Sequence, residues 1–106
     1  MVVSEYIKLV SGELSRAMLM NINENFVSVS FQSLDGAGLH FRFIMKKVGE
    51  LEEELVDDIV AEFEALHIPN ELEKVEIILE NFVNAEDLEN LVFAKYRKIP
   101  ITLFNY

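Results

Sequence analysis

The sequence predicts an α+β fold, a two-layer sandwich in which two helices cover one face of a mostly antiparallel sheet. Three observations lead to this prediction. Two stretches repeat apolar residues every three or four positions, as amphipathic helices do. Four shorter segments alternate apolar and polar residues, which is typical of half-buried strands. These segments follow the order α-β-β-α-β-β in a chain of 106 residues, which is long enough for one domain.

The first helix is expected over residues 3–20, where apolar residues recur at helical spacing. Turn-forming asparagines interrupt this pattern before the next element. A β-hairpin is predicted over residues 26–46, because two alternating runs flank a turn that contains Gly36 and Gly38. The hairpin residues expected to face the helices are Val27, Val29, Phe31, Leu39, Phe41, Phe43 and Met45.

The second helix is predicted over residues 50–66, with a broad apolar arc and glutamates in its first turn, where the helix dipole favours anions. Pro69 ends it. Two further strands are expected over residues 73–80 and 90–97, and residues 99–106 form a tail.

Composition restricts the classes of partner. The chain has 9 Lys and Arg against 19 Asp and Glu, a formal net charge of −10, which argues against direct binding of nucleic acid. It has no cysteine, so disulfides and thiolate metal sites are excluded. No apolar run is long enough to span a membrane, and the start of the chain lacks a signal-peptide pattern. We therefore expect a cytoplasmic protein whose partner is a basic protein.

No catalytic constellation is evident. His40 is expected on the polar face of a strand at the surface and His67 at a helix end, and their spacing does not connect them. The sequence contains neither a nucleophile elbow nor a metal-binding spacing. Catalytic residues, a metal site and cofactors are therefore not predicted. An enzyme that uses His40 or paired carboxylates remains an alternative without a named substrate.

The second helix carries an acidic face. The residues that point away from its apolar arc are Glu53, Glu54, Asp57, Asp58 and Glu64. Residues 50–66 contain no Lys or Arg, and like charges four residues apart destabilise a helix. Two interpretations stay open: a docking face for a basic partner, or a solvated face whose first-turn acids interact with the helix dipole.

The face of the sheet turned away from the helices is a second candidate surface. It is expected to be open, with apolar Ile44 and Ile78 joined by Tyr96 and Phe26. The polar residues expected around them are Ser28, Ser30, Gln32, His40, Arg42, Lys46, Glu76 and Glu80. A contiguous apolar patch there, or an exposed strand edge, predicts a homodimeric structural or regulatory module without catalytic activity.

Three motifs resemble small bacterial immunity proteins of polymorphic-toxin and contact-dependent growth inhibition systems. They are F-R-F at residues 41–43, E-L-V-D-D-I-V-A-E-F-E-A-L at 54–66 and L-V-F-A-K-Y-R at 91–97. The similarity covers residues 26–98. It implies a cytoplasmic toxin inhibitor that is not an enzyme. Such a protein binds the C-terminal domain of its cognate toxin, often a nuclease, and the resemblance assigns no individual contact residue.

Overall fold

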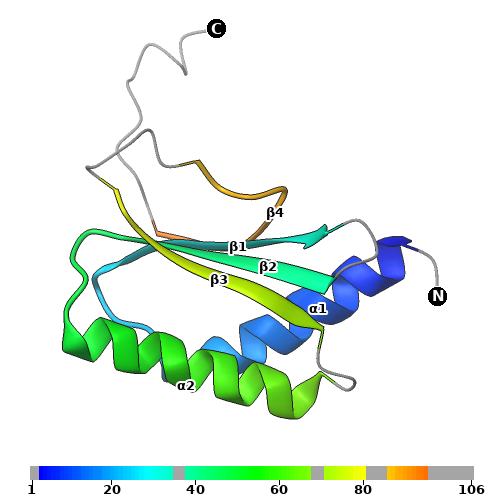
Figure 1. Cartoon of the computed structure of the whole chain (residues 1–106), viewed down its shortest axis with the longest axis horizontal. Coiled ribbons are helices and arrows are strands. Elements are labelled where there is room, and N and C mark those ends of the chain that lie inside the picture. The colour runs from blue at the N-terminus through cyan, green and yellow to red at the C-terminus, as the bar shows by residue number, and fades with distance from the viewer. Residues whose placement is uncertain (1–2, 35–37, 68–70, 81–85, 96–106) are drawn as a thin grey trace, which may run out of the picture.

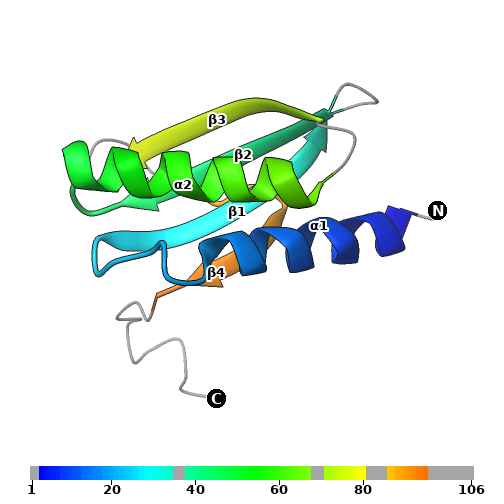
Figure 2. The ribbon, with the colours of Figure 1, turned by 90° about the horizontal axis from the view of Figure 1, so that it is seen from below.

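Two helices pack against the same face of a four-stranded sheet, as Figure 1 and Figure 2 show. The computed structural model describes residues 3–34, 38–67, 71–80 and 86–95. The elements in chain order are α1 (Val3–Met18), β1 (Phe26–Leu34), β2 (Gly38–Met45), α2 (Glu50–Leu66), β3 (Leu72–Leu79) and β4 (Asn90–Ala94). The α+β class and the order of the elements are confirmed. The expected tail at residues 99–106 lies outside the described residues.

The sheet is mixed, which corrects the prediction of a mostly antiparallel sheet. Its strand order is β3-β2-β1-β4. β1 runs antiparallel to both β2 and β4, whereas β3 runs parallel to β2. The parallel pair arises because α2 carries the chain back along the sheet before β3 begins, as crossover helices do. Alternation of apolar residues is the same for either strand direction, so it does not reveal this difference.

The core lies between the helices and the sheet and is rich in phenylalanine. Phe41 of β2 meets Phe63 of α2 edge-on, with ring centroids 4.7 Å apart. The helix-facing residues predicted for the hairpin are confirmed except at Val27. A β-bulge between Phe26 and Ser28 shifts the alternation, so that Phe26 joins the core cluster in its place. Val27 is also buried, outside that cluster.

Apolar residues near the helix ends are more exposed than the apolar pattern suggests. Val3 at the start of α1 is 78% exposed, and Leu51 and Leu66 at the two ends of α2 are also exposed. α1 ends at Met18, before the predicted end of the helix, and β4 ends at Ala94. None of the helices in the described ranges is of a length and apolarity that would let it cross a bilayer.

The start of α2 is fixed by a buried glutamate. Glu52 accepts the backbone N–H of Gly49 at 2.8 Å and the side-chain amides of Asn23 and Asn25 at 3.0 and 3.3 Å. These bonds, led by the one from Asn23, hold the pKa of Glu52 below its ordinary value. Glu52 therefore ties the connection before β1 to α2 and differs from the exposed glutamates beside it.

Gly38 begins β2 at a place where only glycine fits. Its φ is +109°, and a Cβ added there would lie 2.3 Å from the carbonyl oxygen of Glu71. The next residue, Leu39, donates its backbone N–H to that same oxygen at 2.7 Å. This close approach starts the pairing of β2 with β3. Gly36, the other glycine of the predicted turn, lies outside the described residues.

Candidate functional site

The face of the sheet turned away from the helices is not open, contrary to expectation. The segment 86–88, which leads into β4, lies across it (Figure 1). The backbone N–H of Leu88 donates to the hydroxyl of Ser30 at 2.8 Å, and the hydroxyl of Ser28 donates to the carboxylate of Asp87. Both serines are fully buried. Polar residues on this face therefore bind a returning segment of the chain.

A closed polar network links β2 and β3 on the same face. Glu76 accepts hydrogen bonds from His40 and from Nε of Arg42, the latter at 2.9 Å, and Arg42 also donates to the carbonyl of Glu86 at 2.8 Å. Burial alone would raise the pKa of Glu76, but the bonds from Arg42 and His40 outweigh it and lower the pKa.

The network corrects the expectation of a surface histidine at position 40. His40 is only 4% exposed. Within the described ranges, every buried side-chain nitrogen or oxygen has a hydrogen-bond partner. The arrangement joins β2, β3 and the covering segment. A structural role therefore explains why His40, Arg42 and Glu76 occur on this face.

The second candidate surface does not form as predicted. Ile44 is 1% exposed and Phe26 belongs to the core between helices and sheet. Ile78, paired with Ile44 across β2 and β3, is half-buried. Tyr96 lies outside the described residues. Ile44 is therefore a packing residue and not part of an exposed patch.

Replacing Ile44 with Asp is expected to destabilise the domain by about 3 kcal/mol or more, because it places an unpaired carboxylate in a buried apolar position. Ile78→Asp provides the control, because its half-buried side chain retains contact with water. Thermal unfolding followed by circular dichroism measures both effects. An Ile44→Asp protein that melts at the wild-type temperature would contradict the buried position.

The acidic face of α2 is exposed where it was predicted. We define it by Glu53, Glu54, Asp57 and Asp58, which are all exposed. In the part of the chain that the structure describes, none of these four carboxylates forms an ion pair with a Lys, Arg or His side chain. Glu64 differs, because it is half-buried and interacts with other residues. The face therefore consists of four carboxylates on the first half of the helix.

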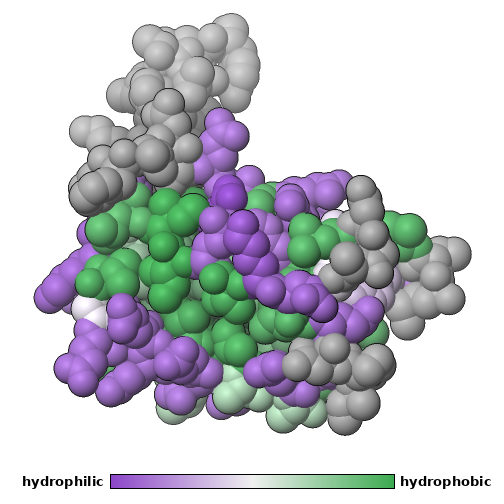
Figure 3. All heavy atoms as spheres, viewed as in Figure 1, coloured by the Kyte–Doolittle hydropathy of each residue, from purple (hydrophilic) through white to green (hydrophobic). Residues whose placement is uncertain are grey.

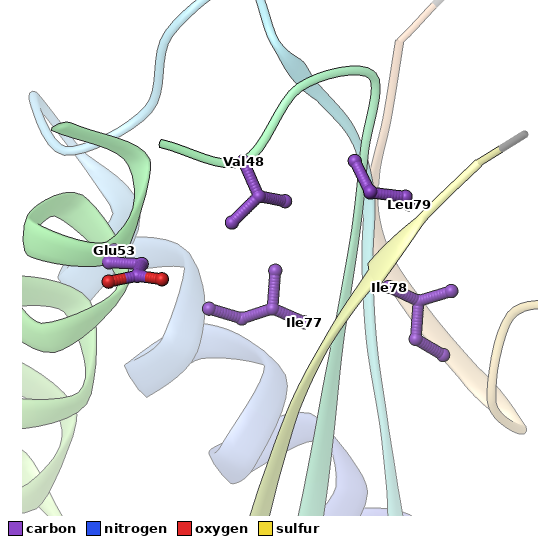
Figure 4. A pocket seen from close by; sticks show the side chains of 5 residues that line it. All are labelled: Val48, Glu53, Ile77, Ile78 and Leu79. Carbon is purple, nitrogen blue, oxygen red and sulfur yellow. The ribbon is translucent and has the colours of Figure 1, made fainter. Parts of the chain in front are cut away.

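An apolar hollow lies between this face and the edge of the sheet. It has a volume of about 450 Å³ and is lined by Val48, Glu53, Ile77, Ile78 and Leu79. Figure 4 shows Glu53 from α2, Val48 from the loop before it and Ile77 from β3 around a common space. Figure 3 shows apolar surface beside β3, bordered by hydrophilic surface over the start of α2.

Sequence reasoning missed this hollow. The available signal was the uncharged run from Ile77 to Leu79, in a strand whose first half carries Glu73 and Lys74. Local periodicity does not distinguish that run from an inner strand, because it does not show that β3 lies at the edge of the sheet.

The sequence matches no protein-family model and none of the curated proteins. In the described ranges, no three His, Asp or Glu side chains are grouped so that they could hold a metal ion. The acidic face and the adjoining hollow form the candidate functional site, because exposed carboxylates beside apolar surface suit the binding of a protein.

Proposed function

We propose that the chain is a bacterial immunity protein, a cytoplasmic inhibitor that is not an enzyme. It binds and neutralises the C-terminal domain of a cognate toxin, a basic nuclease of a polymorphic-toxin or contact-dependent growth inhibition system. The observation that supports this proposal is the acidic face, with four exposed carboxylates on a helix that has no cation. A nuclease needs a basic surface to bind nucleic acid, and an acidic inhibitor is attracted to that surface.

The helix dipole does not account for the whole face. It explains acids in the first turn, such as Glu53, but Asp57 and Asp58 lie beyond that turn. Glu53 and Asp57, like Glu54 and Asp58, are four residues apart, a spacing at which like charges repel. The acids that stabilise the fold form a separate set, which includes Glu52 and Glu76. A basic partner that binds this face would supply the cations that these four carboxylates lack in the described part of the chain.

The growth of a bacterial host tests the proposal. The C-terminal domain encoded by the gene immediately upstream is expressed with and without this protein. We expect growth arrest by that domain alone and recovery when both are present. Recovery must also depend on binding, so the two proteins should co-purify. Absence of toxicity, or toxicity without rescue, would overturn the immunity function.

A homodimeric module is the second candidate function, and one observation favours it. Leu19 and Met20, after the end of α1, are 67% and 96% exposed. They line an apolar hollow of about 270 Å³ together with Val92 and Phe93 of β4. Exposed apolar groups of this kind are typical of interfaces. Light scattering over a range of protein concentrations distinguishes a dimer from a monomer, and a monomer at high concentration would exclude this candidate.

A further inference from the structure

We propose that an extended, cationic segment of the toxin binds along the outer edge of β3 as an additional strand. Its apolar side chains enter the hollow beside Ile77, and a Lys or Arg of the segment meets Glu53. This inference rests on the proposed immunity function and specifies the contact that the function uses. It is carried by the hydrogen-bonding pattern of β3, the residues at its edge and the charge next to it.

β3 has unused main-chain groups on its outer side. It is the last strand on one side of the sheet, and in the described ranges no strand pairs with its outer edge. The backbone N–H of Glu80 donates to the carbonyl of Met45 in β2, at 2.9 Å. Since alternate residues of a strand point their amides to opposite sides, Val75, Ile77 and Leu79 direct theirs away from β2. These groups are placed to bond with a partner strand.

The second half of this edge lacks the usual protection against pairing. Natural edge strands carry charged residues, prolines or bulges that prevent association with other strands. In β3 the exposed Glu73 and Lys74 occupy the first half, but the run from Ile77 to Leu79 has no charge and no proline. An unprotected half beside a protected half suits a binding site that is limited to one part of the edge.

The hollow supplies side-chain recognition next to the main-chain groups. Successive side chains of a strand point to opposite faces, so every second side chain of an added strand faces α2. The side chains of Ile77 and Ile78 leave β3 on opposite sides (Figure 4). The space on the Ile77 side is bounded by Val48 and by the carboxylate of Glu53. An apolar side chain fits this space, and a neighbouring cation pairs with Glu53.

Charge decides which partner occupies the edge. A second copy of the chain would also offer a β3 edge, but each copy carries a net charge of −10. Glu53 lines the hollow at this edge, so two copies paired there would bring their acidic faces together. Such like-charge contacts disfavour association, whereas a basic segment is attracted to the same place. We therefore assign the edge to the toxin and not to a homodimer.

Amide hydrogen exchange measured by NMR tests this inference with a pattern that no other contact produces. In the free protein, the outward N–H groups of Val75, Ile77 and Leu79 should exchange faster than those of Glu76 and Ile78, which face β2. In the complex with the upstream-encoded domain, exchange at the three outward groups should slow by at least about tenfold, because they become hydrogen-bonded. If exchange at these groups also slows without that domain, when only the concentration of this protein is raised, the edge belongs to a homodimer. That result would overturn the proposal.

A pair of variants at one position separates main-chain from side-chain recognition. Leu79→Ala shortens the side chain and keeps the N–H, whereas Leu79→Pro also removes the N–H that faces outward. We expect Leu79→Pro to weaken toxin binding at least about tenfold more than Leu79→Ala, with circular dichroism confirming that both are folded.

The outcomes distinguish the two proposals. If the toxin binds and growth is rescued while the outward amides still exchange rapidly, the strand addition is wrong and the immunity function stands. If the two Leu79 variants bind equally well, main-chain pairing at that position is also excluded. If the domain neither binds nor is neutralised, the immunity function itself fails, as the growth assay shows independently.

Discussion

Replacement of His67 by Ala should lower the free energy of unfolding by about 3 kcal/mol, because it removes the side chain that bonds two carboxylates in a buried cluster. His67 ends α2 and is 4% exposed. Its Nδ1 lies 2.6 Å from the carboxylate of Glu13 in α1, and its Nε2 lies 2.6 Å from that of Glu71, just before β3. The ring also stacks on Phe63, with centroids 5.0 Å apart. The substitution leaves the two carboxylates without their common partner. It also leaves a cavity where the ring was.

The contribution of His67 to the stability of the fold decreases as the pH rises. Burial alone would lower the pKa of His67, but hydrogen bonds to Glu13 and Glu71 outweigh it and raise the pKa above its ordinary value. The pKa of a histidine in the unfolded chain is about 6.5, and below that pH the stabilisation from His67 is fully present. The stabilisation is lost as the pH rises through the higher pKa of His67 in the folded protein. The bond from His67, followed by that from Tyr6, lowers the pKa of Glu71, so its contribution is lost in acid.

Urea unfolding at pH 6 and pH 9 measures this effect. The difference in stability between wild type and His67→Gln should be larger at pH 6, because glutamine does not titrate. Burial and its bond to Glu71 raise the pKa of Tyr6 to about 12, so this neighbour stays protonated in both buffers. An equal difference at the two pH values would show that the imidazolium makes no such contribution.

Reversal of two charges on the acidic face, Asp57→Lys with Asp58→Lys, should slow association with the toxin about 10- to 100-fold at low salt. Both residues are exposed and form no ion pair in the described part of the chain, so the fold should be retained. The salt dependence of the association rate should become shallower, because less electrostatic attraction remains to be screened.

Stopped-flow association over a range of ionic strength provides the measurement. The matched control is Glu5→Lys with Glu89→Lys, which changes the net charge equally at exposed positions outside α2. We expect the control to have a smaller effect, since local charge dominates over net charge at short range. If both double variants slow association equally, the acidic face acts only through the net charge of the protein and not through its position.

The sequence predicts the elements of this fold well because each buries one face. The apolar arc places α2 at its observed bounds, and the hairpin strands follow their alternation as far as the bulge at Phe26. Relations between distant residues are not encoded in local periodicity. The parallel direction of β3 and the bond from Leu88 to Ser30, which spans 58 residues, arise only in the folded chain.

The candidate site also has one part that the sequence predicts and another part that it does not predict. Exposure of Glu53, Glu54, Asp57 and Asp58 follows from helical geometry, and their role in binding stays a prediction. The hollow beside them depends on which strand forms the edge of the sheet, which periodicity does not report. Similarly, His67 was expected at a helix end, but its two carboxylate partners come from α1 and from the approach to β3.

The place of β4 beside β1 has a consequence for biosynthesis. β1 is an inner strand of the sheet, yet one of its two neighbours is β4, the last of the four described strands to be made. The bond from Asn90 to the carbonyl of Phe31 spans 59 residues. Until the ribosome has released β4, one side of β1 and its buried serines have no cover, so the nascent chain is open to wrong pairing. The sheet therefore becomes complete only after the hairpin, α2 and β3 have been made, and folding of this long-range kind is slow compared with that of helical bundles.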